Sequence, residues 1–292
     1  MRLLKVDTLE FVEFFEDRVP PYAILSHTWR EEEVSYREML QPITGATQAK
    51  EGYKKIKGFA SLVSQTQWGY IWVDTCCINK DSSAELTEAI NSMYRWYKNS
   101  GRCYVYLDDT CRWKTRGWTL QELIAPIEVH FYTCGWDFIF TKAELIYEIA
   151  DLLKIEVGVL LSSDPSTASI AQRMCWASSR TTSRSEDMAY CLMGLFDVNM
   201  PLLYGEGGEK AFLRLQEEIL KTSEDNSIFA WTLQDAHWSF HAGLLATCPA
   251  QFRHSAHIEW QHWNTNEEQT LPAHTKMGVS LTMATQIPGL RM

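Results

Sequence analysis

The sequence lacks several features that would place it in a specialised class of protein. Its 292 residues contain no run of Lys or Arg, and the net charge is −10. An acidic chain without a basic patch has little general affinity for nucleic acid or for an anionic membrane, so neither is expected as a partner. No stretch reaches the roughly 20 apolar residues that span a bilayer. The first residues, MRLLKVDTLEF, also lack the apolar core of a secretory signal, and we therefore expect a cytoplasmic, globular chain.

Cysteine spacings typical of metal or redox sites are absent as well. The eight cysteines include no Cys-x-x-Cys motif, and reduced, structural thiols are the expectation for an intracellular chain. Cys76 and Cys77 are adjacent, but the sequence places no histidine beside them to activate a nucleophile. His237 and His241 lie four residues apart with no third ligand implied, so no metal site is predicted.

Short apolar runs alternate with helical patterns in the first half of the chain. Continuous apolar runs at residues 22–26, 70–74 and 103–107 are typical of strands buried on both faces. Between them, residues 53–63 and the stretch after residue 82 repeat apolar side chains at helical spacing. The alternation predicts an α/β fold with a mostly parallel sheet flanked by helices. No GxGxxG or Walker motif is present, so a dinucleotide held in the usual Rossmann manner is not indicated.

The pattern becomes helical in the second half. Residues 142–153, 186–196 and 209–220 each repeat apolar side chains at helical spacing, and residues 162–169 have the composition of a polar linker. We expect three regions. These are an α/β domain at 1–160, a helical extension packed on it at 161–235, and an irregular C-terminal segment at 236–292.

Polar residues stand where the predicted strands end. Ser26 and His27 close the first strand, Asp74 the second, and Asp108 follows the third. In open parallel sheets, ligands bind outside the carboxyl ends of the strands, so these residues predict a binding site at that edge. Taken singly, each also suits a structural role: Ser26 and Asp74 can brace loops, and His27 can pack as a hydrogen-bonded core residue.

The segment RGWTLQEL at residues 116–123 begins just beyond the third predicted strand. At about 100° per residue, Trp118 and Glu122 stand one helical turn apart on one face, and the leucines lie on the opposite face. One face can therefore be buried while the other meets a ligand. In an isolated Trp-x-x-x-Glu motif the commoner arrangement is a packed Trp and a solvated Glu.

Three motifs, in this order, resemble the fungal heterokaryon-incompatibility (HET) domain. They are AILSHTW at residues 23–29, WVDTCCIN at residues 72–79 and RGWTLQEL at residues 116–123. Residues 176–206 are also similar to the region that follows this domain in its relatives. The resemblance implies a role in non-self recognition and programmed cell death in a fungus.

HET domains are regarded as distant relatives of TIR domains, and the resemblance therefore implies a TIR-like, flavodoxin-like sheet. Many TIR domains hydrolyse NAD with the glutamate of a Trp-x-x-x-Glu segment. By this comparison the chain is an NAD glycohydrolase that uses NAD as substrate and no cofactor. Glu122 is then the catalytic residue, and Trp118 forms a wall on the nicotinamide side.

The same comparison implies the remaining substrate-binding residues. Ser26, His27 and Trp29 would line the loop after the first strand, and Asp74 would begin a loop corresponding in position to the mobile loop over the TIR cleft. Arg116 suits either the diphosphate or a structural ion pair.

TIR-like domains also act by self-association. The resemblance thus implies a homo-oligomer on activation and a regulatory protein partner. It leaves a second hypothesis open, in which the chain is a non-catalytic signalling module that triggers cell death through a partner. Thiol chemistry at Cys76 or Cys77 ranks behind both.

Overall fold

The structure is a computed structural model, and it describes residues 1–15, 18–232, 243–260, 273–275 and 278–280. His237 and His241 lie outside the described residues.

A seven-stranded mixed sheet organises the N-terminal part, with strand order β2-β1-β4-β3-β5-β6-β7. The strands are β1 (Arg2–Lys5), β2 (Phe11–Glu13), β3 (Ala23–His27), β4 (Tyr70–Trp72), β5 (Arg102–Leu107), β6 (Val129–Thr133) and β7 (Phe138–Thr141).

The four central strands are parallel, as the apolar runs predict. β3 pairs in parallel with both β4 and β5, and β5 pairs in parallel with β6. In chain order these strands are arranged second, first, third, fourth, which is the flavodoxin-like order. All five residues of β3 are buried, because helices cover both faces of the sheet. The predicted α/β fold is confirmed.

The two edges of the sheet are antiparallel and were not predicted. β1 pairs antiparallel with β4, β2 extends that edge, and β7 pairs antiparallel with β6. Strands of three or four residues are too short for their side-chain alternation to stand out in the sequence. The sequence also gave no sign of two short helices in the polar segment after β3, namely α1 (Tyr36–Leu40) and α2 (Gly45–Ala49).

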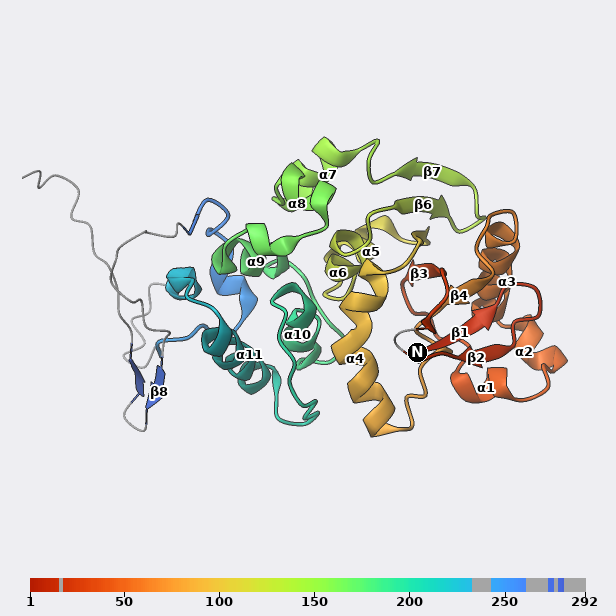
Figure 1. The fold of residues 1–292 in the computed structure, drawn as a ribbon, viewed down its shortest axis with the longest axis horizontal. Helices are drawn as coiled ribbons and strands as arrows, with labels where there is room; N and C mark the ends of the chain where they lie inside the picture. The colour runs from red at the N-terminus through yellow and green to blue at the C-terminus, as the bar shows by residue number, and fades with distance from the viewer. Residues whose placement is uncertain (16–17, 233–242, 261–272, 276–277, 281–292) are drawn as a thin grey trace, which may run out of the picture.

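Helices of the α/β part pack on the sheet and lead to the C-terminal helices. Figure 1 shows α4 between the sheet and α10. The helices of this part are α3 (Glu51–Val63), α4 (Ser83–Lys98), α5 (Thr110–Thr115) and α6 (Thr119–Ile124). The C-terminal helices are α7 (Ile146–Leu153), α8 (Val157–Ser162), α9 (Ile170–Ala177), α10 (Asp187–Tyr190) and α11 (Gly208–Thr222). Among the described residues, no helix has both the length and the apolar character needed to cross a membrane.

Two predicted helices are wrong in extent. The helix expected from residue 142 begins only at Ile146, because β7 and a turn occupy the residues before it. The helix expected at 186–196 is divided into α10 and a 3₁₀ turn, η3 (Met193–Leu195). The structure also adds α9, and the short strands β8 (Ala273–Thr275) and β9 (Gly278–Ser280) pair with each other in the segment expected to be irregular.

The extension packs closely on the α/β part where η3 meets α4. A Cβ atom added at Gly194 would lie 2.1 Å from the Cβ of Tyr94, far inside van der Waals contact. Tyr94 belongs to α4, so the absence of a side chain at position 194 sets the approach of the extension.

Gly194→Ala is therefore expected to destabilise the chain. Overpacking of this kind costs about 1–3 kcal/mol of unfolding free energy, which urea denaturation can measure. Gly158→Ala is the matched control, since a Cβ there meets nothing within 4 Å and should be neutral or stabilising. Equal effects of the two substitutions would show that close packing at Gly194 does not hold the extension in place.

Candidate active site

Glu122 lies on a short helix that is buried on every side. All six residues of α6 are buried, and Glu122 is only 6% exposed. The alternative of a solvated glutamate does not hold, because β3, α4 and α5 all contact α6. The carboxyl group nevertheless lines a cavity at the carboxyl edge of the sheet.

Two buried cations hold the ends of this helix. At its start, the guanidinium of Arg180 donates hydrogen bonds to the backbone oxygen of Arg116 at 2.8 Å and to the hydroxyl of Thr119 at 3.1 Å. At its end, the ammonium of Lys142 donates to the backbone oxygens of Leu123 and Pro126. Burial lowers the pKa of Lys142 to about 8 and that of Arg180 to about 10. The bond to Leu123 satisfies a backbone oxygen that the end of a helix leaves unpaired.

Ser26 holds the carboxylate of Glu122 by a hydrogen bond. Its hydroxyl donates a 2.5 Å hydrogen bond to Oε2 of Glu122 and accepts one from the indole nitrogen of Trp113 at 2.9 Å. Ser26 is fully buried and does not line the cavity. The structure therefore brings Ser26 to the site, as the sequence predicts, but in contact with Glu122 and not with the cavity.

The pKa of Glu122 is raised to about 7. Burial is the largest cause, and the negative charge of Asp74 adds to it; the hydrogen bond from Ser26 and the charges of Arg116 and Arg180 act in the opposite direction. A carboxyl group that titrates near neutral pH in a cavity is typical of a functional site.

His27, Trp29 and Asp74 form a second polar group beside Glu122. One oxygen of Asp74 accepts a hydrogen bond from Nε2 of His27 at 2.8 Å, and the other accepts one from the indole nitrogen of Trp29 at 2.7 Å. Burial opposes ionisation of Asp74, but the interactions with His27, Lys80 and Trp29 outweigh it and lower the pKa. The ammonium of Lys80 lies 3.4 Å from the centre of the Trp29 ring. An ionised Asp74 thus fixes both neighbouring side chains.

One cavity of about 390 Å³ connects these groups. The side chains that line it include cations (Lys80, Arg112, Arg116, Arg184), carboxylates (Asp74, Glu122, Asp187) and aromatic rings (Trp29, Trp118, Tyr204), together with aliphatic and hydroxyl side chains. The guanidinium groups of Arg112 and Arg116 make no hydrogen bond or ion pair with another described residue. In an acidic chain, unpaired arginines in one cavity indicate an anionic ligand.

The helical extension supplies one wall of the cavity. Residues 181–184, Asp187 and Tyr204 line it, although sequence reasoning assigned no role to them. In the sequence, the feature that pointed to them was the similarity of residues 176–206 to the region after the HET domain. The segment docks through Gly117, whose backbone nitrogen donates to the oxygen of Thr181 at 2.9 Å. A Cβ at Gly117 would lie 2.6 Å from the methyl group of Thr182, so only glycine permits this approach.

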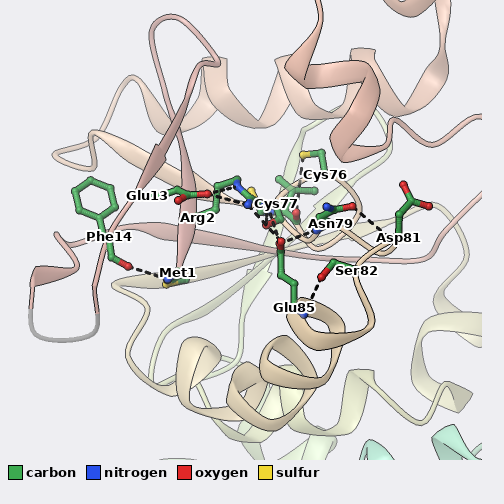
Figure 2. A network of polar contacts seen from close by, with 11 residues as sticks. Met1, Arg2, Glu13, Phe14, Cys76, Cys77, Asn79, Asp81, Ser82 and Glu85 are labelled. Carbon is green, nitrogen blue, oxygen red and sulfur yellow. Dashed lines mark hydrogen bonds and ion pairs between the residues drawn. The ribbon is translucent and has the colours of Figure 1, made fainter. Parts of the chain in front are cut away.

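The loop after β4 is tied to the N-terminal strand (Figure 2). Oε1 of Glu85 accepts hydrogen bonds from the backbone nitrogen of Asn79 at 2.7 Å and from Arg2 at 2.8 Å. Arg2 also donates to the backbone oxygen of Cys77. The Ser82 hydroxyl caps α4 by accepting a hydrogen bond from the backbone nitrogen of Glu85, while the Glu85 carboxylate is engaged with the loop. The part of this loop beyond Cys77 is thereby anchored.

The cysteines are unpaired, and Cys76 is not activated as a nucleophile. All eight are free, and Cys76 and Cys77 are buried away from the cavity lining. The adjacent thiol of Cys77, together with burial, raises the pKa of Cys76, which disfavours a thiolate nucleophile. Across the described part of the chain, no three His, Cys, Asp or Glu side chains are grouped to hold a metal ion.

The sheet order and the position of the cavity place the chain among the doubly wound α/β proteins that bind ligands at the carboxyl edge of the sheet. Residues 22–112 match the family described as Heterokaryon incompatibility protein (HET), and residues 210–278 match a domain of unknown function (DUF8212). Residues 22–112 therefore carry a HET domain, which confirms the predicted resemblance to that domain. The distant relation to TIR domains stays a prediction.

A curated relative covers nearly the whole chain. The Vegetative incompatibility protein HET-E-1 of Podospora anserina is 45% identical over 302 residues, which is 93% of this chain. The chain spans only 22% of the length of that relative. No solved structure matches the chain.

The raised pKa of Glu122 predicts a pH-dependent effect of Glu122→Gln on stability. The folded chain keeps this proton up to about pH 7, whereas the ordinary pKa is 4.5, so stability falls as the pH rises between these values. Above pH 7 the buried carboxylate costs about 3 kcal/mol, which glutamine does not incur. We expect the variant to gain this amount at pH 8 and little at pH 5 in urea denaturation. The exposed control Glu148→Gln should behave alike at both pH values, and a pH-independent effect of Glu122→Gln would contradict the raised pKa.

Proposed function

We propose that this chain is an NAD glycohydrolase that cleaves the bond between nicotinamide and ribose. One observation carries the proposal: the Glu122 carboxyl and the Trp118 indole line the same cavity as unpaired arginines. A dinucleotide offers what each group suits, namely a ribose for the carboxylate, a flat ring for the indole and a diphosphate for the arginines.

A single carboxylate suits this reaction. Most glycosidases need two carboxyl groups, because one of them must protonate the leaving oxygen. The nicotinamide nitrogen is already cationic and leaves as a neutral ring, so no general acid is required. An ionised Glu122 stabilises the positive charge that develops on the ribose, an effect that is strong where water is excluded.

The hydrogen bond from Ser26 orients the carboxylate for this role. Ser26 donates to Oε2, and no described residue donates a hydrogen bond to Oε1. The second oxygen is therefore available for the ribose hydroxyl groups. In this proposal Ser26 is a positioning residue, and Asp74 acts likewise by fixing His27 and Trp29 at the cavity wall.

The guanidinium groups supply the binding charge. Arg112 and Arg116 line the cavity without an ion-pair partner among the described residues, and a planar guanidinium can bind phosphate oxygens in pairs. The Trp118 ring packs on the nicotinamide side and excludes water from the reacting bond.

The biological role follows from the HET domain and its relative. The name of HET-E-1 describes a vegetative incompatibility protein. We propose that this chain likewise acts in heterokaryon incompatibility, where loss of NAD in the cytoplasm causes cell death. Activation by homo-oligomerisation, under control of a regulatory protein partner, belongs to the same proposal.

The test is nicotinamide release from NAD by the purified chain over a series of protein concentrations. Glu122→Gln should reduce the rate by about 100-fold or more, because it removes the charge while keeping size and hydrogen bonding. Glu148→Gln should match the unmodified chain. A rate per chain that rises with concentration would support activation by assembly.

Two results would contradict the proposal. Equal rates for Glu122→Gln and the unmodified chain would remove Glu122 from the chemistry. No release at any concentration, with folding verified by circular dichroism, would instead favour the non-catalytic module that signals through a partner.

A further inference from the structure

The extension carries a stacked pair of side chains at the wall of the cavity. The guanidinium of Arg184 lies 4.2 Å from the centre of the Tyr204 ring. Both residues are exposed and both line the cavity. A guanidinium that stacks on an aromatic ring presents a flat, charged surface on which a nucleic acid base can stack.

Asp187 holds this pair in place relative to α6. Its carboxylate accepts a hydrogen bond from the Tyr204 hydroxyl at 2.9 Å. Burial raises the pKa of Asp187, while hydrogen bonds from Tyr204 and Trp118 and the charge of Arg184 act against that rise. Asp187 thus connects the stacked pair to the indole that flanks Glu122.

Three arginine side chains line the cavity, which is more positive charge than is needed to bind the ribose end of a substrate. Arg112, on α5, and Arg116, at the end of that helix, line the cavity together with Arg184. Neither Arg112 nor Arg116 is paired with another described residue, so both can bind an anion without breaking an existing ion pair.

We infer that the extension completes a second subsite of the cavity, which binds a nucleoside diphosphate. The Arg184–Tyr204 pair takes the base, Arg112 and Arg116 take the phosphates, and Asp187 is a positioning residue. The inference rests on the proposed function only in one respect, that the bound group is half of a dinucleotide. Binding itself requires no turnover.

Isothermal titration calorimetry of the unmodified chain with three probes tests this subsite. ADP carries both base and phosphates, inorganic pyrophosphate lacks the base, and adenosine lacks the phosphates. ADP should bind about tenfold or more tighter than either fragment, because only ADP uses both parts of the subsite.

Variants separate charge from stacking. Arg184→Ala should weaken ADP binding about tenfold and affect pyrophosphate less, since the base loses its stacking partner. Arg184→Lys keeps the charge without the flat group and should not restore ADP binding.

Tyr204→Phe keeps the ring and tests the bond to Asp187. Arg37→Ala removes an exposed arginine that is paired with Asp81 outside the cavity and should leave all three affinities unchanged. Melting temperatures show that each variant is folded.

The outcomes distinguish this inference from the proposed function. Absence of ADP binding, ADP binding no tighter than pyrophosphate, or unchanged binding by folded Arg184→Ala would each overturn the subsite, even if NAD is cleaved. Tight ADP binding that Arg184→Ala weakens would support the subsite, even if the chain releases no nicotinamide.

Discussion

The hydrogen bond between Ser26 and Glu122 joins the first parallel strand to the helix that carries the candidate catalytic group. α6 packs against β3, α4 and α5, and this packing buries the carboxyl group next to Ser26. Burial makes the charged form of Glu122 costly, and the hydrogen bond partly offsets that cost. The charged form of Glu122 therefore lowers the free energy of unfolding, and such a local loss of stability is a common property of functional sites.

The helical extension contributes both to the position of α6 and to the wall of the cavity. Arg180 binds the start of α6 from the extension, and Gly117 admits the segment that follows Arg180 against the RGWTLQEL motif. The same segment leads to the wall formed by Arg184, Asp187 and Tyr204. In this structure the cavity lies where the α/β sheet and the extension meet, so both are needed to form it.

The sequence predicted the place of the site better than its surroundings. Buried strands and the parallel-sheet rule placed Ser26, His27 and Asp74 at one edge, where the structure finds them, and the helical period placed Trp118 and Glu122 together. Periodicity states which side chains share a face but not how many neighbours cover it, so the burial of Glu122 was missed. Loops have no period, and Arg184 and Tyr204 therefore gave no signal of their own.

Glu122 is a largely buried carboxyl group that lines a cavity, and its titration is the measurement that tests this most directly. Carbon-13 NMR of the side-chain carboxyl, assigned by its loss in Glu122→Gln, follows ionisation at this one position. The account predicts a midpoint near pH 7, with a further rise in Ser26→Ala because a stabilising hydrogen bond to the charged form is lost. A midpoint near the ordinary value of 4.5 would show a solvated carboxylate and contradict the account.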